Sequence, residues 1–301
     1  MTARPAAACL LIAVAWMPRA AEPAPAPAAP TCDMVLIPGG AFDMGSDHGM
    51  DYEGPVHRVQ VRPFWMDRCE VTNKEFARFV AATGYRSESE KQGWSGVFVP
   101  GAQEWQPTKG ADWRHPEGPS SSLAGRDDQP VVQVSFDDAA AFAKWAGKRL
   151  PTEAEFERAA RGGLAHAEYA WGDRLHPDGR EMANTWQGHF PEHDAGTDGY
   201  ARIAPVGRFP PNGYGLLDIA GNVWEWTTDW FSADYYARAT GAVDPQGPAQ
   251  GEERAIRGGS WMCSANYCTG YRVAARQHTP PDSGLNNLGF RCVRSAATVP
   301  R

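Results

Sequence analysis

The sequence predicts a single loop-rich domain that combines a few helices with short strands. A chain of 301 residues, of which 42% are hydrophobic, is long enough to enclose one large core. Its 32 glycines and 25 prolines predict many turns between short elements. Capping motifs before apolar stretches predict helices, and apolar runs near the N-terminal end predict strands. No internal repeat divides the sequence, so we expect one folded unit.

The first expected elements are two strands and a helix. Residues 34–37 are continuously apolar and are followed by a proline and two glycines, which is typical of a strand. Residues 56–61 alternate between apolar and polar side chains and predict a half-exposed strand. Thr72 and Glu75 form a capping box in front of apolar residues at helical spacing, which predicts a helix over 72–83.

A long segment without periodicity follows this helix. Residues 86–130 are rich in Gly, Pro, Ser and Trp and predict an irregular excursion of the sort usually kept for function. Residues 131–134 predict a short strand, and Ser135 begins a second helix. Thr152 opens a third helix with another capping box. Beyond residue 165 helical periodicity disappears, and turn residues, Trp and Tyr dominate.

The N-terminal end has the pattern of an export signal. Arg4 supplies a positive charge, the run from Ala6 to Met17 is apolar, and Ala20 and Ala21 are small residues suited to cleavage. The apolar run is too short for a membrane span. A wrongly chosen start codon is the alternative interpretation.

This pattern sets the expected domain organisation and location. We expect a signal peptide over residues 1–21, a semi-extended tether rich in Pro and Ala over 22–31, and a domain over 32–301. The mature protein is then periplasmic or secreted. A net charge of -7 and the lack of a basic cluster argue against a nucleic-acid partner. We expect a monomer without a membrane span.

Two cysteines five positions apart stand in the run Arg257-Gly-Gly-Ser-Trp-Met-Cys263-Ser-Ala-Asn-Tyr-Cys268. Two thiolates form a soft donor set that suits Cu(I), zinc or an iron–sulfur cluster. Structural zinc sites use four ligands, but no second cysteine pair lies nearby and His278 is the only histidine downstream of Cys263. A disulfide between the two cysteines is the alternative. Closing so short a loop gains little stability, which favours a redox or metal role.

Three further cysteines, Cys32, Cys69 and Cys292, remain once the signal peptide with Cys9 is removed. In an oxidising compartment they allow one disulfide and one free thiol. The sequence leaves all three pairings open. We favour Cys32 with Cys292, because both flank expected strands near the two ends of the chain.

The thiol run and several other segments resemble the formylglycine-generating enzymes, which oxidise a sulfatase cysteine to formylglycine. The further segments are Gly147-Lys-Arg-Leu-Pro-Thr-Glu-Ala-Glu-Phe-Glu, Ala274-Ala-Arg276, Thr279-Pro-Pro-Asp282 and Asn287-Leu-Gly-Phe-Arg-Cys292. The resemblance covers residues 33–294 and implies one α+β domain, loop-rich and related to the C-type lectin fold. Many relatives share the fold and lack the thiols. This chain keeps both, which favours an oxidase over the family's non-oxidase members.

The resemblance implies a copper-dependent reaction at the two thiols. Cys263 and Cys268 would hold Cu(I) as thiolates, and the cysteine of a Cys-x-Pro-x-Arg segment in a sulfatase would join them. O2 would then react at the metal. Removal of a hydrogen from the β-carbon of the substrate cysteine would give a thioaldehyde that hydrolyses to the aldehyde.

The resemblance also implies roles for residues around the thiols. Ser260 and Trp224 match active-site residues, and Tyr267, Asn287 and Arg276 match residues that bind the substrate. Each has a structural alternative. Ser260 would cap a turn, Trp224 and Tyr267 would belong to the core, and Arg276 would form an ion pair.

Two loops carry hard oxygen donors of the kind that calcium prefers. Taken alone, Asn and Asp beside Gly are ordinary turn formers, and the second loop would be plain core and turn. The resemblance implies two calcium sites. The first set comprises the side chains of Asn184 and Asp198 with the carbonyls of Thr185 and Tyr200. The second set comprises the side chains of Asp218 and Glu225 with the carbonyls of Gly221 and Val223.

Two other functions stay open. One is a non-catalytic binding module of the same fold, in which the thiols form a disulfide under a ligand surface. The other is an iron-dependent relative that oxidises small thiols, which needs a histidine cluster, yet the eight histidines show no helical His-x-x-x-His pairing. The family's usual bridge from the cysteine matching Cys292 to the helix near Trp145 is absent, because this chain has Ala143 and no cysteine there.

Overall fold

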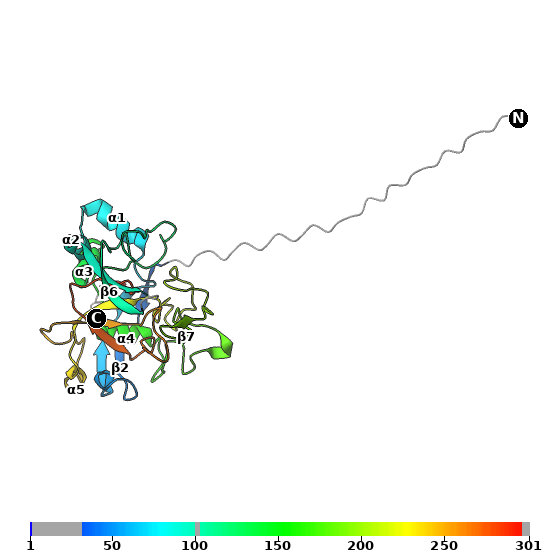
Figure 1. The fold of residues 1–301 in the computed structure, drawn as a ribbon. Coiled ribbons are helices and arrows are strands. Elements are labelled where there is room, and N and C mark those ends of the chain that lie inside the picture. The colour runs from blue at the N-terminus through cyan, green and yellow to red at the C-terminus, as the bar shows by residue number, and fades with distance from the viewer. Residues whose placement is uncertain (2–31, 100–102, 297–301) are drawn as a thin grey trace. The chain divides into compact units, whose positions relative to one another are not determined.

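Two sheets, in which most neighbouring strands are antiparallel, form the framework of the fold, and helices pack around them (Figure 1). Apart from Met1, the computed structural model describes residues 32–99 and 103–296, so the rest of the expected signal peptide and tether lies outside the described residues. Residues Thr31–Arg301 form one compact unit. The described residues include no helix with the length and apolarity needed to cross a membrane.

The larger sheet has four strands in the order β11-β10-β9-β12. Its strands are β9 (Trp224–Trp230), β10 (Arg254–Arg257), β11 (Arg276–Thr279) and β12 (Leu288–Gly289). Strands β9, β10 and β11 are antiparallel neighbours, and β12 runs parallel to β9. The smaller sheet places β4 (Phe64–Asp67) between β1 (Met34–Ile37) and β13 (Val293–Ser295), antiparallel to both.

Within residues 32–99 and 103–296, three hairpins and five helices complete the fold. The hairpins pair β2 (Gly40–Met44) with β3 (His57–Val61), β5 (Trp94–Val99) with β6 (Glu104–Lys109), and β7 (Gly188–His189) with β8 (His193–Asp194). The helices are α1 (Asn73–Thr83), α2 (Glu88–Gln92), α3 (Phe136–Trp145), α4 (Glu153–Ala160) and α5 (Tyr235–Arg238), with 3-10 turns at Asp51–Glu53 and Pro177–Gly179.

The capping motifs form as the sequence predicts. The side chain of Thr72 accepts the backbone N–H of Glu75, and the Glu75 carboxylate accepts the N–H of Thr72, so α1 begins where expected. Ser135 and Thr152 cap α3 and α4 in the same reciprocal way. The expected half-exposed strand is also confirmed, since β3 buries alternate residues.

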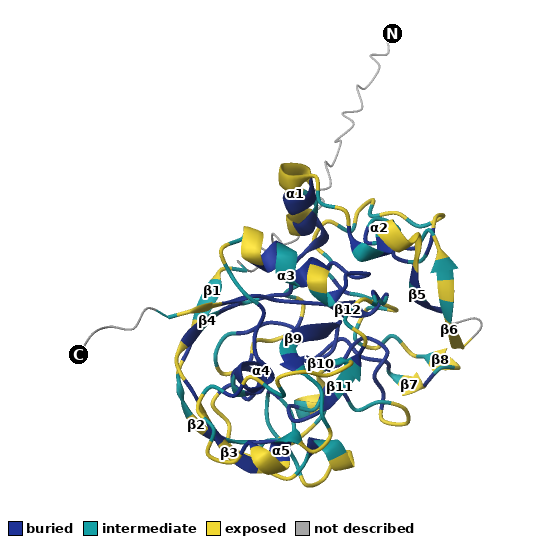
Figure 2. Cartoon of the chain, turned by 90° about the vertical axis from the view of Figure 1, so that its left-hand side faces the viewer, coloured by how far each residue is buried: buried dark blue, intermediate teal, exposed yellow. Residues whose placement is uncertain are grey.

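Helix α4 anchors the larger sheet through buried charge. Its Glu153 binds Arg276 on β11 through both carboxylate oxygens at 2.7 Å and Arg257 on β10 at 3.0 Å. One turn later, Glu157 binds Arg257 at 2.7 Å and Arg161 at 2.6 Å. All five side chains are buried, so losing one partner would leave an uncompensated charge in the interior. Figure 2 shows α4 and β9 among the most buried elements.

The region between α1 and α3 is more regular than the sequence predicts. The excursion over 86–130 contains α2 and the β5–β6 hairpin. By contrast, the expected strand over 131–134 is wrong. Val131 donates its N–H to Val71 and Gln133 donates to Leu285, so these residues pair with two different segments and build no ladder. After residue 165, where no helix is expected, the short α5 forms.

The disulfide that the sequence favours is also wrong. Cys32 is bonded to Cys69, with 5.3 Å between their Cα atoms, and Cys292 is a buried free thiol. Cys32 precedes β1 and Cys69 follows β4, and the antiparallel pairing of these strands brings the two cysteines together. Cys292 precedes β13, on the other side of β4, where its carbonyl accepts the N–H of Asp67.

Candidate active site

The two thiols lie in the long loop that connects β10 to β11. Cys263 is fully buried, and Cys268 is partly exposed, with 4.7 Å between their Cα atoms. Two turns shape this loop, because Cys263 donates its N–H to the Ser260 carbonyl at 2.9 Å and Cys268 donates to the Ser264 carbonyl at 3.1 Å. The two sulfurs are disulfide-bonded in the structure. Cys263 therefore belongs to the core, whereas Cys268 packs at its edge and is partly exposed.

Ser260 lies directly against Cys263, and Asn287 holds Ser260 in place. The backbone N–H of Ser260 donates to the Cys263 sulfur at 3.4 Å. The side-chain amide of Asn287 donates to the Ser260 hydroxyl at 3.1 Å and approaches the Met262 sulfur at 3.3 Å. The Asn287 oxygen is buried without a hydrogen-bond partner.

Trp224 closes the site from the larger sheet. It is the first residue of β9, it is buried, and its N–H donates to the Asn287 carbonyl at 2.8 Å. Gly270 explains how the indole comes so close to the sulfur. A Cβ atom at position 270 would lie 2.4 Å from the Trp224 ring and 3.0 Å from the Cys263 sulfur, so any side chain there would collide with both.

Tyr267 stands on the exposed side of the thiol loop. Its side chain is 57% exposed and stacks on Phe190, with ring centroids 4.2 Å apart. Phe190 in turn stacks on Phe98 of β5 at 5.2 Å. The loop residue Asn266 binds both backbone groups of Phe190. A stack of three aromatic rings, of which only Tyr267 is exposed, therefore lies next to the partly exposed Cys268, and Tyr267 is not a core residue.

Arg276 lies apart from this group. Its guanidinium is buried, is held by Glu153, and stacks over the rings of Tyr236 at 4.2 Å and Phe231 at 4.7 Å. The guanidinium also donates to the carbonyls of Tyr52 and Ser232. Because it is buried and held by Glu153 on α4, the geometry favours the structural ion pair that the sequence left open as the alternative role.

The first expected calcium set comes together in one loop. Asp198 accepts the backbone N–H of Thr185 at 3.1 Å and of Tyr200 at 2.9 Å. The Asn184 amide nitrogen donates to Asn222, but the Asn184 oxygen is buried and has no partner. Burial raises the pKa of Asp198. The partnerless Asn184 oxygen and the desolvated Asp198 carboxylate are hard donors of the kind that calcium prefers. The Gln187 amide nitrogen donates to Asp198 at 2.7 Å and to the Thr185 carbonyl, so calcium would have to displace it from both.

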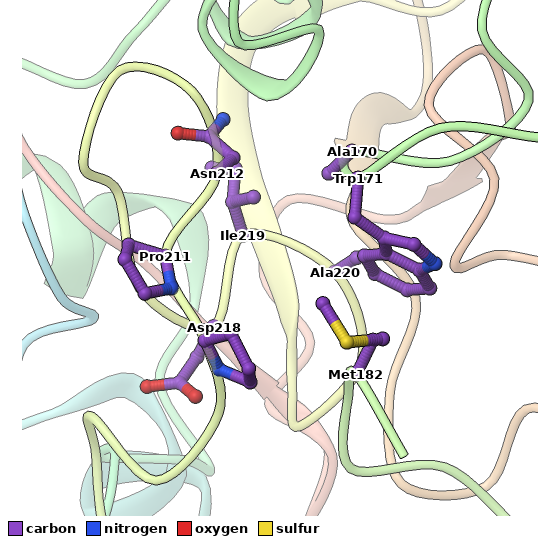
Figure 3. Close-up of a pocket in the computed structure, with 9 residues that line it drawn as sticks. Ala170, Trp171, Met182, Pro211, Asn212, Asp218, Ile219 and Ala220 are labelled. Atoms are coloured by element: carbon purple, nitrogen blue, oxygen red, sulfur yellow. The ribbon is translucent and has the colours of Figure 1, made fainter. Parts of the chain in front are cut away.

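In the second expected calcium set, the two carboxylates already have hydrogen-bond partners. Asp218 lines a small pocket with Trp171 and Met182, and its carboxylate points away from both side chains (Figure 3). One Asp218 oxygen accepts the N–H of Gly207, and the other is buried without a partner. Glu225, however, is not free, because Arg291 binds both of its oxygens at 2.8 Å.

Glu70 adds a third carboxylate that the sequence did not indicate. It is fully buried, one of its oxygens has no partner, and Arg291 lies 3.8 Å away. Burial raises the pKa of Asp218 to about 6 and also raises the pKa values of Glu70 and Glu225. One arginine thus faces three buried carboxylates, and the excess negative charge suits a divalent cation.

Asn222 links the two expected sets. Its side-chain oxygen accepts the Asn184 amide at 2.9 Å, and its side-chain nitrogen donates to Glu70 at 3.0 Å. Gly221, from the second set, has a positive φ of 77°, and a Cβ there would lie 2.3 Å from the Asn184 carbonyl oxygen. Val223 lies two residues further on and is fully buried. The described residues hold no cluster of three His, Cys, Asp or Glu side chains of metal-binding geometry, so both sets depend on amide and backbone oxygens.

Comparison with known proteins decides the family. A family model for the sulfatase-modifying factor enzyme 1-like domain matches residues 19–296. The chain belongs to this family. The resemblance seen in the sequence and the fold class it implies are therefore confirmed.

Several relatives are similar over most of their length. The chain is 52% identical to a formylglycine-generating enzyme of Thermomonospora curvata, covering 86% of this chain and 92% of the relative. It is 49% identical to the enzyme of that name from Bos taurus, covering 87% and 75%. It is also 43% identical to an inactive C-alpha-formylglycine-generating enzyme 2 of Mus musculus, covering 87% and 86%. Membership of the family alone therefore does not decide activity.

Solved structures agree on the fold. PvdO from Pseudomonas aeruginosa superposes with a TM-score of 0.66 at 29% identity, covering 87% of this chain and 94% of PvdO. A variable protein from Treponema denticola superposes with a TM-score of 0.64 at 23% identity, covering 87% and 95%. At the latter identity the likeness concerns the fold alone.

The structure brings most of the expected site residues together. Cys263, Cys268, Ser260, Trp224 and Asn287 form one group, with Tyr267 at its exposed edge. Sequence reasoning missed Gly270, Glu70 and Asn222. A glycine two residues after a cysteine is a signal of close approach, whereas no local pattern marks the other two, whose role depends on contacts between distant segments.

Proposed function

We propose that this protein is a copper-dependent oxidase that uses O2 to convert the cysteine of a Cys-x-Pro-x-Arg segment in a sulfatase to formylglycine. Relatives named formylglycine-generating enzymes, at about half identity over most of the chain, support the conversion. The observation that carries the proposal is the pairing of a buried Cys263 with a partly exposed Cys268 beside Ser260 and Trp224.

The donor set supports copper. After reduction, two adjacent thiolates favour a soft monovalent cation over zinc or iron, since among the described residues they are not part of a group of three or more His, Cys, Asp or Glu side chains that could hold a metal. Cu(I) bound there would activate O2 and hold the thiolate of the substrate cysteine close to it. Three other residues of the chain surround the proposed copper site. The Ser260 N–H donates to the Cys263 sulfur, Asn287 fixes the Ser260 hydroxyl, and the Trp224 ring excludes water from the buried side.

The electron balance requires a thiol reductant. Oxidation of the substrate cysteine to a thioaldehyde releases two electrons and two protons. Hydrolysis then replaces sulfur by oxygen and releases hydrogen sulfide. Reduction of O2 to two molecules of water takes four electrons, so two more come from a pair of external thiols that become a disulfide. The same thiols would convert the Cys263–Cys268 disulfide of the structure to the dithiol that binds copper.

A peptide assay tests the function. The mature protein, reduced with a dithiol and loaded with Cu(I), is incubated in air with a Cys-x-Pro-x-Arg peptide, and mass spectrometry follows the replacement of the thiol by the aldehyde. A peptide with Ser in place of Cys is the control for the reacting atom. Aldehyde that depends on both copper and O2 supports the proposal. Its absence, with the peptide bound, would favour the non-catalytic binding module.

We also propose two calcium ions as structural partners of this site. The partnerless oxygens of Asn184 and Asp218, and the three carboxylates around Arg291, support the proposal. The ions would balance buried charge and fix the loops that approach the thiols.

A further inference from the structure

A second, polar cavity lies beside the thiol loop. It has a volume of about 110 Å³ and is lined by Glu117, Arg126, Gln129, Arg202, Ile203, Trp261 and Asn286. Two of these residues adjoin the proposed active site, because Trp261 stands two positions before Cys263 and Asn286 directly precedes Asn287. Two residues span at most about 7 Å of chain, so the cavity is within reach of a polypeptide that places its cysteine at the thiols.

The two arginines of the cavity are incompletely satisfied. Arg126 uses only Nη1, which donates to both Glu117 oxygens at 2.8 and 3.0 Å. The guanidinium of Arg202 donates no hydrogen bond within the described part of the chain, and its nearest carboxylate oxygen, on Glu117, lies 3.8 Å away. Two positive charges thus share one carboxylate, and most of their N–H groups remain available.

Among the other polar side chains of the cavity, the Trp261 N–H is a donor without a partner, and the Gln129 oxygen is an amide acceptor to which no described residue donates. The indole of Trp261 is buried, and its N–H has no acceptor. Gln129 donates to the Ile203 carbonyl at 2.9 Å, and the Asn286 amide exchanges hydrogen bonds with the backbone of Phe98 at 3.1 and 3.3 Å. Donors therefore exceed acceptors, and a buried indole N–H normally has a partner.

We propose that this cavity binds a carboxylate, supplied by an acidic side chain of the substrate polypeptide within a few residues of the target cysteine. A carboxylate brings acceptors only, can accept from Arg202 and Arg126 in forked geometry, and satisfies the Trp261 N–H. The net charge of the lining side chains is positive, which disfavours a basic side chain. This inference rests on the proposed function, because that function identifies the substrate polypeptide as the molecule that carries the carboxylate. A free small carboxylate is the other source of the same chemistry.

The first arm of the test is a peptide series. Each position flanking the Cys-x-Pro-x-Arg motif is set in turn to Glu, Gln or Lys, and kcat and KM for aldehyde formation are measured. One position is expected at which Glu lowers KM about three- to tenfold relative to Gln with kcat unchanged. Arg202→Gln should remove this preference. Arg174→Gln, at an exposed arginine outside the cavity, should keep it.

The second arm needs no turnover. The ¹⁵N-labelled protein is titrated with sodium acetate and, separately, with the Glu and Gln peptides, and the indole N–H resonance of Trp261 is assigned by its loss in Trp261→Phe. A shift with the Glu peptide but not the Gln peptide supports a substrate carboxylate. A shift with acetate alone assigns the cavity to free anions and overturns the substrate role.

Failure of this inference is distinct from failure of the proposed function. If peptides are oxidised but no position distinguishes Glu from Gln by more than twofold, or the preference survives Arg202→Gln, the cavity does not read a substrate carboxylate. If no peptide is oxidised, the indole resonance still decides, because an unmoved Trp261 signal with every ligand contradicts carboxylate binding.

Discussion

The backbone N–H of Trp186 donates to the carbonyl of Cys263 at 3.0 Å. Trp186 directly follows Thr185, whose own N–H donates to Asp198 in the first proposed calcium set. The loop expected to hold calcium and the loop that carries the thiols are therefore joined by a main-chain hydrogen bond. We therefore expect a change in one loop to reach the other through the main chain.

This hydrogen bond predicts that calcium binding to the first set affects copper binding at the two thiols. Replacing Asp198 by Asn should weaken calcium binding, loosen the loop around Thr185, and lower the affinity of the reduced protein for Cu(I) by on the order of tenfold. Copper affinity is measured by competition with a chromophoric Cu(I) chelator, with and without calcium. Asp178→Asn, at a highly exposed carboxylate, is the control and should change neither affinity. Equal copper affinity in the calcium-loaded and calcium-free wild type would contradict the link.

The second calcium set predicts an unusual pH dependence. In the calcium-free protein, burial raises the pKa of Asp218 from its ordinary 3.8 to about 6. The folded state then holds a proton that the unfolded state has released, so stability falls as pH rises from about 4 to about 6 and stays lower above. Calcium should reverse this loss at neutral pH, because it binds the ionised form.

Asp218→Asn tests this explanation. The variant removes the buried charge, so without calcium it should be more stable than the wild type at pH 7 by up to about 3 kcal/mol, and no more stable at pH 4. It should also lose the part of the calcium-induced stabilisation that depends on the second set. Urea unfolding in the presence of a chelator gives both values. A variant less stable than the wild type at pH 7 would show that the Asp218 charge is well compensated.

Replacing Gly270 by Ala tests whether turnover depends on the close approach of Trp224 to the Cys263 sulfur. In Gly270→Ala the new methyl group would press on Trp224 and on the Cys263 sulfur, which should destabilise the protein by about 1–3 kcal/mol and abolish turnover in the molecules that remain folded. Gly251→Ala is a matched control, since its Cβ would meet Trp230 at 3.0 Å, away from the thiols. That control should keep full turnover per folded molecule. Wild-type activity in Gly270→Ala would mean that Trp224 does not need to lie against the sulfur.

Export can be checked on the protein from its native cell. The pattern of residues 1–21 predicts a mature N-terminus near residue 22, and the Cys32–Cys69 disulfide supports an oxidising compartment. N-terminal sequencing of protein recovered from the native cell measures this directly. A chain that still carries Met1 would place the protein in the cytoplasm.

Local signals predicted the elements that local contacts build. Thr72, Ser135 and Thr152 each cap a helix with a partner three residues away, so the sequence alone contains both halves of the interaction. The failures involve distant partners. Cys32 pairs with Cys69 because two strands align, and the residues after Pro130 form no strand because they bond to two separate segments.

The same difference between local and distant contacts applies to the candidate active site. The thiol pair and its neighbours Ser260 and Asn287 could be named from motifs that carry a family resemblance. The position of Arg276 could not, since only the fold places it against Glu153 on α4. Nor could the sequence indicate that Glu70 shares Arg291 with Glu225, because these three residues lie far apart along the chain.

The central claim is that Cys263 and Cys268 form a copper site and act together. Serine at either position replaces a soft thiolate by a hard, protonated hydroxyl and leaves a single soft ligand. Cys292→Ala is the control, because Cys292 is a free, buried thiol outside the site and can affect turnover only through stability. If the pair were only a structural disulfide, the Cys263→Ser and Cys268→Ser variants would lose stability and keep their activity per folded molecule.

The most direct measurement is the aldehyde yield of Cys268→Ser on the Cys-x-Pro-x-Arg peptide, per folded molecule, together with its copper content. The copper-oxidase account predicts that both collapse, while Cys292→Ala keeps both at the wild-type level in the molecules that fold. Wild-type aldehyde yield in Cys268→Ser would contradict the account, however closely the surrounding residues match those of the family.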